Sequence, residues 1–409
     1  MPFLAPHIAH VPPSGIRRIF ELALGLDDVI FLAVGEPDVA VDPSILAAGS
    51  AAWLGDETNY GPNGGLTPLR EAITAKLARE NDIHVDTDRV WVTVGGMHAL
   101  YLSMSLTLAP GDEVLIPDPG YSTFAMNAAM ISAVSVPYPL LAQADFLPDI
   151  KGLAALVTPR TRAIIINSPS NPLGSVFPRE TLVELLAFAK RHDLWIISDE
   201  VYEAFNYEHP HTSIASLDTD DRVFSVFSLS KTYALTGARV GYLITPPGLG
   251  KVMRSAQEAM ISCVSTPAQL AALAAITGSQ EHVAASAVHY RANLAAATAL
   301  LAERCIRYLD PTGAFYLWVD MSHDTGGDVS AWAERFLIQQ RVAVAPGSAF
   351  GAQGEGWIRL CVAADRAELL EGIRRLPAPL TRIPFSGSSR AQPPGAVGGG
   401  YCLKTAWAT

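Results

Sequence analysis

Residues that can react with an aldehyde and bind a phosphate lie together in one short stretch. Residues Phe227 to Gly241 read FSLSKTYALTGARVG, with Lys231 after Ser228 and Ser230, and Arg239 further along. A lysine amine forms a Schiff base with an aldehyde, hydroxyls bond to a phosphate, and a guanidinium binds the phosphate through two parallel hydrogen bonds. An S-x-S-K sequence alone more often places its lysine in solvent. In this setting the stretch predicts a site for pyridoxal phosphate, and the other motifs test that prediction.

Such a site needs a rigid scaffold, and the middle of the chain alternates apolar strands with helices. This alternation indicates an α/β fold with a mostly parallel, seven-stranded sheet covered by helices on both faces, and a ligand is expected at the carboxyl ends of its strands. Asn171, Asp199 and Lys231 all fall at or just after predicted strand ends, so we expect them to meet at one edge. The predicted strands are 90–94, 113–116, 133–136, 162–166, 195–198, 222–227 and 241–244, and the helices 121–131, 178–192 and 251–277.

Four side chains near these strand ends suit a pyridoxal ring. Asp199 ends an apolar strand in IISDEVY, and an anion beside the ring nitrogen keeps the ring able to accept electrons. Tyr202 and Asn171 could bond to the phenolic oxygen of the ring, and Tyr121 could stack on its face. Taken singly, each has an ordinary alternative: a helix cap for Asp199, a turn for Asn171, a half-buried aromatic for Tyr202 and core packing for Tyr121.

Two glycine-rich turns are candidates for binding an anion or a ligand. The strand 90–94 runs into Gly95, Gly96 and Met97 and then into a helix, so free backbone N–H groups and the positive end of the helix point the same way. The turn Tyr60-Gly61-Pro62-Asn63-Gly64-Gly65 precedes a predicted helix over 67–81. The helix is interpreted as structural and the turn as part of a site.

Arg359 stands alone among apolar residues in GWIRLCVA. A buried arginine needs an anion, so it either forms a structural ion pair or binds a substrate carboxylate bidentately. Taken alone, the ion pair is favoured. Gly35, at the end of a predicted strand over 29–35, allows a ligand to approach the backbone closely, although an ordinary turn needs the same residue.

The ends of the chain differ from its middle. A proline-rich arm over 1–13 is expected to be extended, and Ser14 is predicted to cap a helix that continues to about Gly25. We predict four parts: 1–37, an N-terminal arm and part of a small domain; 38–277, the large cofactor-binding domain; 278–380, a small α+β domain; and 381–409, a disordered tail. The small domain is predicted to contain helices over 281–303 and 367–376 and strands over 314–319, 342–344 and 357–362.

Composition limits the classes of function. The chain has 409 residues, about half of them apolar, and a formal charge of −11, which argues against sequence-independent binding to nucleic acid. Its four cysteines form no C-x-x-C pair, so neither a metal site nor a disulfide framework is indicated. The first 18 residues show no basic start followed by an apolar core, and no run is long enough to span a bilayer, so a cytoplasmic location is expected.

The order of the motifs resembles one family. VGEPD, NYGPNGGLTPLREAI, TVGG, DEVLIPDPGYSTF, INSPSNPLG, ISDEVYE, FSLSKTYALTGARVGY, PTGAFY, RVAVAPGSAFG and WIRLCVA are similar to motifs of the class I aminotransferases of the aspartate aminotransferase superfamily. These are pyridoxal phosphate enzymes of fold type I. The resemblance covers about residues 14 to 376.

The resemblance implies a role for each candidate residue. Lys231 is expected to form the Schiff base with the cofactor and to move the proton at the substrate Cα. Asp199 pairs with the ring nitrogen, Tyr202 and Asn171 bond to the ring oxygen, and Tyr121 stacks on the ring. The phosphate is held by Gly95, Gly96, Met97, Ser228, Ser230, Arg239 and, from the other subunit of a homodimer, Tyr60, while the substrate carboxylate is bound by Arg359, Gly35 and Asn171.

Two positions depart from the aspartate-using relatives of this subgroup. Those relatives commonly have a lysine just after the glycine turn and a hydroxyl near the N-terminal helix, where this chain has Met97 and Ile16. We therefore expect a pocket for an apolar or aromatic side chain, and a ping-pong transfer of the amino group from an L-amino acid to a 2-oxo acid such as 2-oxoglutarate. An aspartate-type aminotransferase, a C–S lyase and a specialised biosynthetic enzyme on the same fold are the alternatives.

Overall fold

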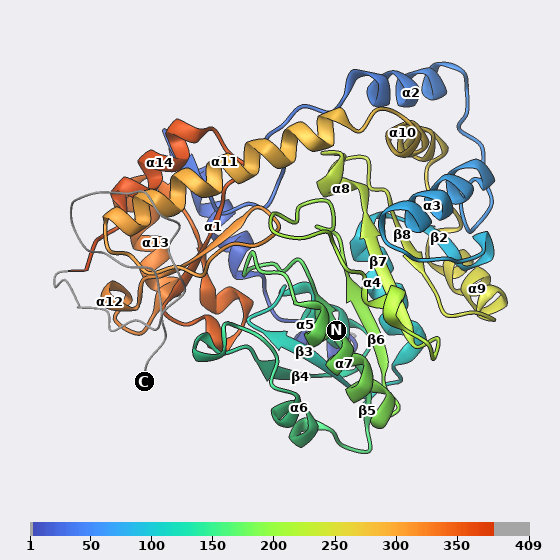
Figure 1. Cartoon of the computed structure of the whole chain (residues 1–409), viewed down its shortest axis with the longest axis horizontal. Helices are drawn as coiled ribbons and strands as arrows, with labels where there is room; N and C mark the ends of the chain where they lie inside the picture. Colours follow the sequence, from blue (N-terminus) through green and yellow to red (C-terminus); the bar gives the residue numbers. More distant parts are fainter. Residues whose placement is uncertain (1–2, 380–409) are drawn as a thin grey trace, which may run out of the picture.

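A seven-stranded sheet forms the centre of the molecule (Figure 1), which the computed structural model describes over residues 3–379. The strand order is β2-β8-β7-β6-β5-β3-β4. β8 runs antiparallel to β2 and β7, and the remaining neighbours are parallel. The predicted mostly parallel, seven-stranded sheet is therefore confirmed. The strands are β2 Val90–Thr93, β3 Glu113–Asp118, β4 Val134–Pro139, β5 Thr161–Asn167, β6 Trp195–Asp199, β7 Val223–Ser228 and β8 Gly241–Ile244.

The central strands are apolar on both faces because helices cover both. Along β5, Ile164 and Ile166 belong to one buried cluster, whereas Ile165 between them belongs to another. The first cluster includes Leu185 and Phe188 of helix α7, which spans Arg179–Arg191. The second includes residues of α4 Gly95–Thr107, α5 Thr123–Met130 and α9 Gly250–Ile261. This side-chain alternation across a doubly covered sheet holds the carboxyl ends of the strands rigidly in place.

A second group of elements combines an N-terminal segment, residues 15–31, with the elements that follow residue 280. β11 Ala345–Pro346, β12 Trp357–Cys361 and β9 Tyr316–Asp320 form an antiparallel sheet, and β1 Ile30–Phe31 pairs in parallel with β10 Val342–Ala343. The long helix α11 crosses the molecule from the side of α10 towards α14 (Figure 1). The domain boundaries at residues 37, 277 and 380 stay a prediction. The helices of this group are α1 Gly15–Leu24, α11 Glu281–Glu303, α12 Ser322–Thr325, α13 Val329–Gln340 and α14 Arg366–Arg375.

Most predicted elements are present, and the differences have local causes. The single helix predicted over 251–277 is wrong, because α9 ends at Ile261 and α10 Thr266–Thr277 begins after a break. Ser262 has a φ of 60°, which a right-handed helix does not allow, and Pro267 lies at the first turn of α10, where proline starts helices. The strand expected over 29–35 shortens to Ile30–Phe31, since its end turns into the site described below.

Other elements were not expected from the sequence. The predicted extended arm contains a 3-10 helix at Pro6–His10, and the helices α2 Pro43–Leu54, α6 Ile150–Leu156 and α13 were not predicted. The remaining helix before the sheet, α3 Thr67–Glu80, agrees with its prediction. The tail predicted to be disordered, 381–409, lies outside the described residues. Among residues 3–379, every helix is too short or too polar to cross a bilayer.

Candidate active site

A cavity of about 670 Å³ opens where β5, β6 and β7 end, and it is lined by Asn171, Asp199 and Lys231. The three residues that the sequence placed at strand ends therefore meet in one place. Eight further residues with predicted roles line the same cavity: Gly35, Gly96, Met97, Tyr121, Tyr202, Ser228, Ser230 and Arg239. Arg359 lines it as well, from the other sheet.

Lys231 lies on α8, a four-residue helix from Leu229 to Thr232 that directly follows β7. Ser228 caps this helix by accepting a hydrogen bond from the backbone N–H of Ser230 at 3.2 Å. The Lys231 Nζ donates to the backbone oxygen of Gly35 at 2.6 Å. The pKa of Lys231 is lowered to about 8, mainly by burial; the Arg359 guanidinium also lowers it, and the Cys361 thiol opposes the shift. The amine is therefore more nucleophilic near neutral pH than an ordinary lysine.

Asp199 is the last residue of β6, and its carboxylate is buried with few partners. Its Oδ1 accepts a hydrogen bond from the backbone N–H of Val201 at 3.3 Å. Burial raises the pKa of Asp199 to about 7, and the neighbouring Glu200 carboxylate adds to the shift, while the Val201 N–H and the Lys231 ammonium oppose it. A protonated ring nitrogen placed against this carboxylate would compensate its buried charge, which fits the pyridine of pyridoxal phosphate.

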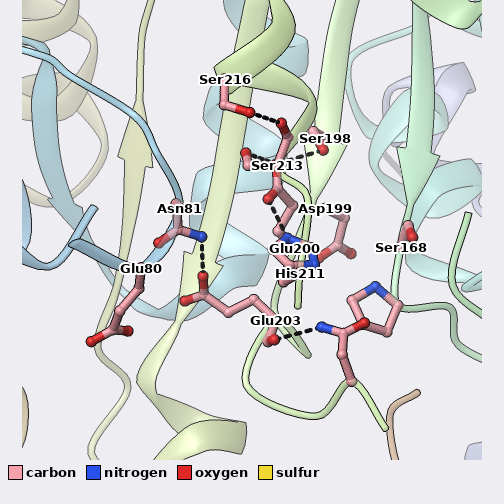
Figure 2. Close-up of polar contacts among 12 residues, drawn as sticks. Glu80, Asn81, Ser168, Ser198, Asp199, Glu200, Glu203, His211, Ser213 and Ser216 are labelled. Atoms are coloured by element: carbon pink, nitrogen blue, oxygen red, sulfur yellow. Dashed lines mark hydrogen bonds and ion pairs between the residues drawn. The ribbon is translucent and has the colours of Figure 1, made fainter. Parts of the chain in front are cut away.

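The turn after Asp199 is fixed by a polar cluster that sequence reasoning missed (Figure 2). The buried Glu200 carboxylate accepts hydrogen bonds from the hydroxyls of Ser198 at 2.8 Å and Ser213 at 2.9 Å, and it lies 2.8 Å from Nε2 of His211. These contacts tie the end of β6 to the segment 211–216. The motif DEVYE shows that Glu200 is a second carboxylate beside Asp199. No sequence pattern indicates that His211 and Ser213 are its partners.

The turn into α4 has the features of a phosphate cradle. Gly95 has a φ of 70°, and a Cβ added there would lie 2.6 Å from Nη2 of Arg239, so a side chain would displace the guanidinium. Helix α4 begins without a side-chain cap, and its first backbone N–H groups are available to an anion. The Arg239 Nη1 donates to the backbone oxygen of Thr236 at 2.8 Å and lies 3.5 Å from the Ser230 hydroxyl.

His98, in the first turn of α4, has an internal partner. Its Nδ1 accepts a hydrogen bond from the backbone N–H of Val94 at 3.2 Å, and burial lowers its pKa. His98 therefore helps to start the helix.

Arg359 is buried in β12 and bonds to neutral oxygens. Its Nη1 donates to Oδ1 of Asn171 at 2.8 Å and its Nη2 to the backbone oxygen of Ala33, and the guanidinium lies 4.5 Å from the ring centroid of Tyr316 and 5.0 Å from that of Phe350. Within residues 3–379 no carboxylate pairs with it, so the structural ion pair that the sequence favoured is not formed. A guanidinium has five N–H donors, and those left over can bind a carboxylate.

The backbone at Gly35 lies so close to Tyr316 that only glycine fits. A Cβ on Gly35 would lie 2.0 Å from the Tyr316 hydroxyl, which in turn lies 2.6 Å from the hydroxyl of Tyr202. Burial raises the pKa of both phenols, so both are neutral hydrogen-bonding groups. Tyr316 lines the cavity but had no role in the sequence prediction, although it ends the quoted motif PTGAFY.

Two residues with predicted roles, Tyr60 and Gly95, do not line the cavity. Tyr60 is 90% exposed and does not line this cavity in its own subunit. Gly95 lies behind the cavity wall, against Arg239. By contrast, Tyr121 is at the cavity, with its ring edge-to-face with Phe124 at a centroid distance of 5.8 Å.

One wall of the cavity is apolar. It is formed by Ile16 and Phe20 of α1, Met97 and Leu100 of α4, and Met126 of α5. Both positions at which the chain departs from the aspartate-using pattern, Ile16 and Met97, are in this wall. Neither side chain can neutralise a negative charge. Within the described residues, no group of three or more His, Cys, Asp or Glu side chains is placed to hold a metal ion.

Comparison with known proteins identifies relatives along most of the chain. Residues 27–376 match the family model described as "Aminotransferase class I and II". An aspartate aminotransferase of Pyrococcus abyssi is 38% identical, covering 90% of this chain and 95% of the relative. An aromatic-amino-acid aminotransferase of Thermococcus litoralis is 34% identical, covering 91% of this chain and 97% of the relative.

Solved structures agree with the sequence matches. An aromatic aminotransferase from Pyrococcus horikoshii superposes with a TM-score of 0.82 at 36% identity, covering 88% of this chain and 97% of that structure. A Thermus thermophilus aspartate aminotransferase superposes with a TM-score of 0.87 at 32% identity, covering 92% of this chain and 99% of that structure. Relatives named as aspartate aminotransferases and relatives named as aromatic aminotransferases thus have similar sequence identities to this chain.

The charge of Asp199 predicts how the stability of the ligand-free protein changes with pH. Its pKa is about 7 in the folded protein, against an ordinary value of 3.8. The folded state thus binds this proton more tightly, which stabilises it below pH 4, and the stabilisation is lost as the pH rises through 7. Relative to Asp199→Asn, the wild type should lose on the order of 4 kcal/mol of unfolding free energy between pH 4 and pH 8.

Urea unfolding of the ligand-free proteins measures this difference. The exposed variant Asp82→Asn is the control and should follow the wild-type pH dependence. If the unfolding free energies of the wild type and Asp199→Asn changed with pH in the same way, Asp199 would have an ordinary pKa and the prediction would be wrong.

Proposed function

The chain belongs to the class I and II aminotransferases and is a transaminase, and we propose that it works with pyridoxal phosphate bound at Lys231. In this proposal it moves the amino group of an L-amino acid with an apolar or aromatic side chain to a 2-oxo acid such as 2-oxoglutarate. The main support is one cavity lined by Lys231, Asp199 and Arg359.

The residues around the cavity fit the cofactor. When bound, pyridoxal phosphate supplies an aldehyde and an electron-accepting ring. Lys231, whose pKa is lowered to about 8, is the amine that holds the aldehyde, and the buried Asp199 carboxylate keeps the ring nitrogen protonated. Tyr202 and Asn171 donate to the ring oxygen, and Tyr121 packs on the ring face. The phosphate is bound by the backbone of Gly95, Gly96 and Met97 together with Ser228, Ser230 and Arg239.

The substrate is bound and deprotonated by the same set of residues. Arg359 binds the α-carboxylate with the donors that Asn171 and Ala33 leave free, and this carboxylate compensates a buried cation. Position 35, beside the substrate, must be glycine, because the Cβ of any other residue would clash with Tyr316. With the cofactor bound, the Lys231 amine would be the base that takes the proton from the substrate Cα and delivers it to the cofactor carbon.

The apolar wall supports the preference for apolar or aromatic donors. A distal carboxylate placed beside Ile16 and Met97 would gain no counter-ion from either side chain. An aromatic ring would instead bury apolar surface. An aspartate-type activity and a lyase or other chemistry on this fold are the alternatives that the same Lys231 would allow.

We further propose a homodimer in the cytoplasm. Tyr60 is 90% exposed and absent from the lining of its own cavity, which suits a phenol that reaches the phosphate in the partner subunit. The free thiols Cys263 and Cys361 suit a reducing compartment.

Borohydride trapping tests the cofactor assignment. Reduction should fix the cofactor irreversibly on the peptide that contains Lys231, as read by mass spectrometry. Lys231→Ala should not be labelled and should lose activity at least about a hundredfold, because both the attachment and the base are removed. Lys251→Ala, at the exposed start of α9, is the control and should behave as the wild type. Label on any other lysine would refute the assignment.

A change at Met97 tests the side-chain preference. The wild type should use phenylalanine and tyrosine with a higher kcat/KM than aspartate, and Met97→Lys should raise the aspartate-to-phenylalanine ratio about tenfold or more by supplying a counter-ion. Met130→Lys is the matched control, since Met130 is similarly exposed but does not line the cavity. A wild type that prefers aspartate would contradict the proposal.

Subunit complementation tests the shared site. We expect Tyr60→Ala and Lys231→Ala to be weakly active alone. Co-expressed, they should recover up to about a quarter of wild-type activity, because half of randomly formed dimers are hybrids with one complete site each. Activity no greater than the sum of the two parents would place Tyr60 outside the partner's site.

A further inference from the structure

Two consecutive carboxylates are buried at the end of β6, and only one of them has a part in the proposed function, on which this inference rests. Asp199 is 3% exposed and Glu200 is 1% exposed. The proposed function assigns Asp199 to the ring nitrogen of the cofactor. Glu200 fixes the turn beside it, and a buried charge also acts on the groups around it, because little water is present to screen it.

The contacts of Glu200 match an ionised carboxylate. Such a group only accepts hydrogen bonds, and Glu200 accepts them from the hydroxyls of Ser198 at 2.8 Å and Ser213 at 2.9 Å (Figure 2). The Nε2 of His211 lies 2.8 Å from the same carboxylate, where a third donor fits. Three donors around one buried side chain stabilise its charged form.

His211 holds this charge without cancelling it. With its hydrogen on Nε2, the neutral imidazole donates to Glu200, and its Nδ1 is buried without a partner among residues 3–379. A doubly protonated ring would bury an unpaired N–H group at Nδ1, which is unfavourable. The neutral ring therefore fits these contacts better, and the negative charge of Glu200 remains.

The two carboxylates also have no lysine or arginine as an ion-pair partner within the described residues. Glu200 pairs with His211 alone, and the carboxylate of Asp199 accepts one hydrogen bond, from the backbone N–H of Val201 at 3.3 Å. Glu203, in the same turn, differs because it pairs with the ammonium of Lys76. Two buried negative charges side by side need a proton or a cation.

Other titratable groups near the two carboxylates come from neighbouring elements. Lys231 of α8 acts on Asp199, while His211 and Tyr242 of β8 lie within the field of Glu200. Burial is the main reason why the pKa of Asp199 is raised to about 7, the Glu200 charge adds to the shift, and Lys231 opposes it. Burial also keeps Tyr242 neutral by raising its pKa.

We propose that Glu200 is a second fixed anion for the cofactor ring, which keeps the ring nitrogen protonated by acting through Asp199. A negative charge at Glu200 favours a proton on the Asp199 carboxylate in the empty site, and on the ring nitrogen once the cofactor is bound. Glu200 does not line the cavity. It is therefore a positioning residue, which holds the proton between Asp199 and the ring without touching either the cofactor or the substrate.

Urea unfolding of the ligand-free protein tests the charge effect without the cofactor. The pH at which folded Asp199 loses its proton is the pH at which the stability difference from the matching Asp199→Asn protein falls. Glu200→Gln keeps the shape of the side chain and removes its charge, so this pH should move down by on the order of one unit. Glu208→Gln removes an equal charge from an exposed position and should leave the pH unchanged.

A second variant makes the result independent of how well Glu200→Gln folds. His211→Lys leaves Glu200 in place and adds an ammonium beside it, and a cavity of about 310 Å³ next to His211 gives the longer side chain room. This variant should lower the pH at which Asp199 loses its proton, as Glu200→Gln does. A pH that stays at the wild-type value in both variants would overturn the proposal.

In the holoenzyme, ¹⁵N NMR of cofactor labelled at the ring nitrogen shows directly whether that atom carries a proton. Glu200→Gln should lose the proton at a pH lower by on the order of one unit than the wild type. Its kcat should fall by up to about tenfold, whereas KM for phenylalanine should stay within about twofold, because no substrate contact is changed. Ser213→Ala removes one hydrogen bond but keeps the charge, and should leave the nitrogen protonated.

The outcomes separate the charge from the shape of the turn. Equal loss of the ring proton in Ser213→Ala and Glu200→Gln would show that the turn alone matters, and would overturn the proposal. A wild type that binds no cofactor at Lys231 would instead refute the proposed function, and the role for the ring with it, even if the ligand-free proteins showed the expected shift.

Discussion

The buried guanidinium of Arg359 is the constraint on which the site depends. It lies in β12 of the smaller sheet, yet its two bonds reach Asn171 after β5 and the backbone of Ala33 after β1. Three segments far apart in sequence are thus joined at one cation. Because its described partners are neutral oxygens, its charge remains uncompensated until an anion arrives. Binding of a carboxylate and completion of the site are therefore the same event in this account.

Two further charged groups at the cavity, Asp199 and Lys231, follow the same logic. Burial pushes the pKa of Asp199 up and that of Lys231 down, so each is held near the neutral range, where protons move most readily. Glu200 and its hydroxyl partners fix the turn that presents Asp199, and the short helix α8 presents Lys231. The large sheet provides rigidity for these groups, and α1 adds Ile16 and Phe20 to the apolar wall.

The sequence predicted the elements better than the contacts between them. Seven strands were found because helix-covered strands are continuously apolar, and the meeting of Asn171, Asp199 and Lys231 followed from parallel topology alone. The helix over 251–277 was predicted as one piece because the composition is helical throughout, and the positive φ of Ser262 has no side-chain signal. The choice between an ion pair and a ligand for Arg359 could not be made from sequence, since it depends on which oxygens tertiary packing brings near.

The most direct test of the central claim is a single-turnover experiment on the purified holoenzyme with L-phenylalanine and no oxo acid. We expect release of one 2-oxo acid per subunit, with loss of the long-wavelength absorbance of the bound cofactor, after which the reaction stops until 2-oxoglutarate is added. Continuous release of ammonia without an acceptor, or no oxo acid from any amino donor, would contradict transamination at this site.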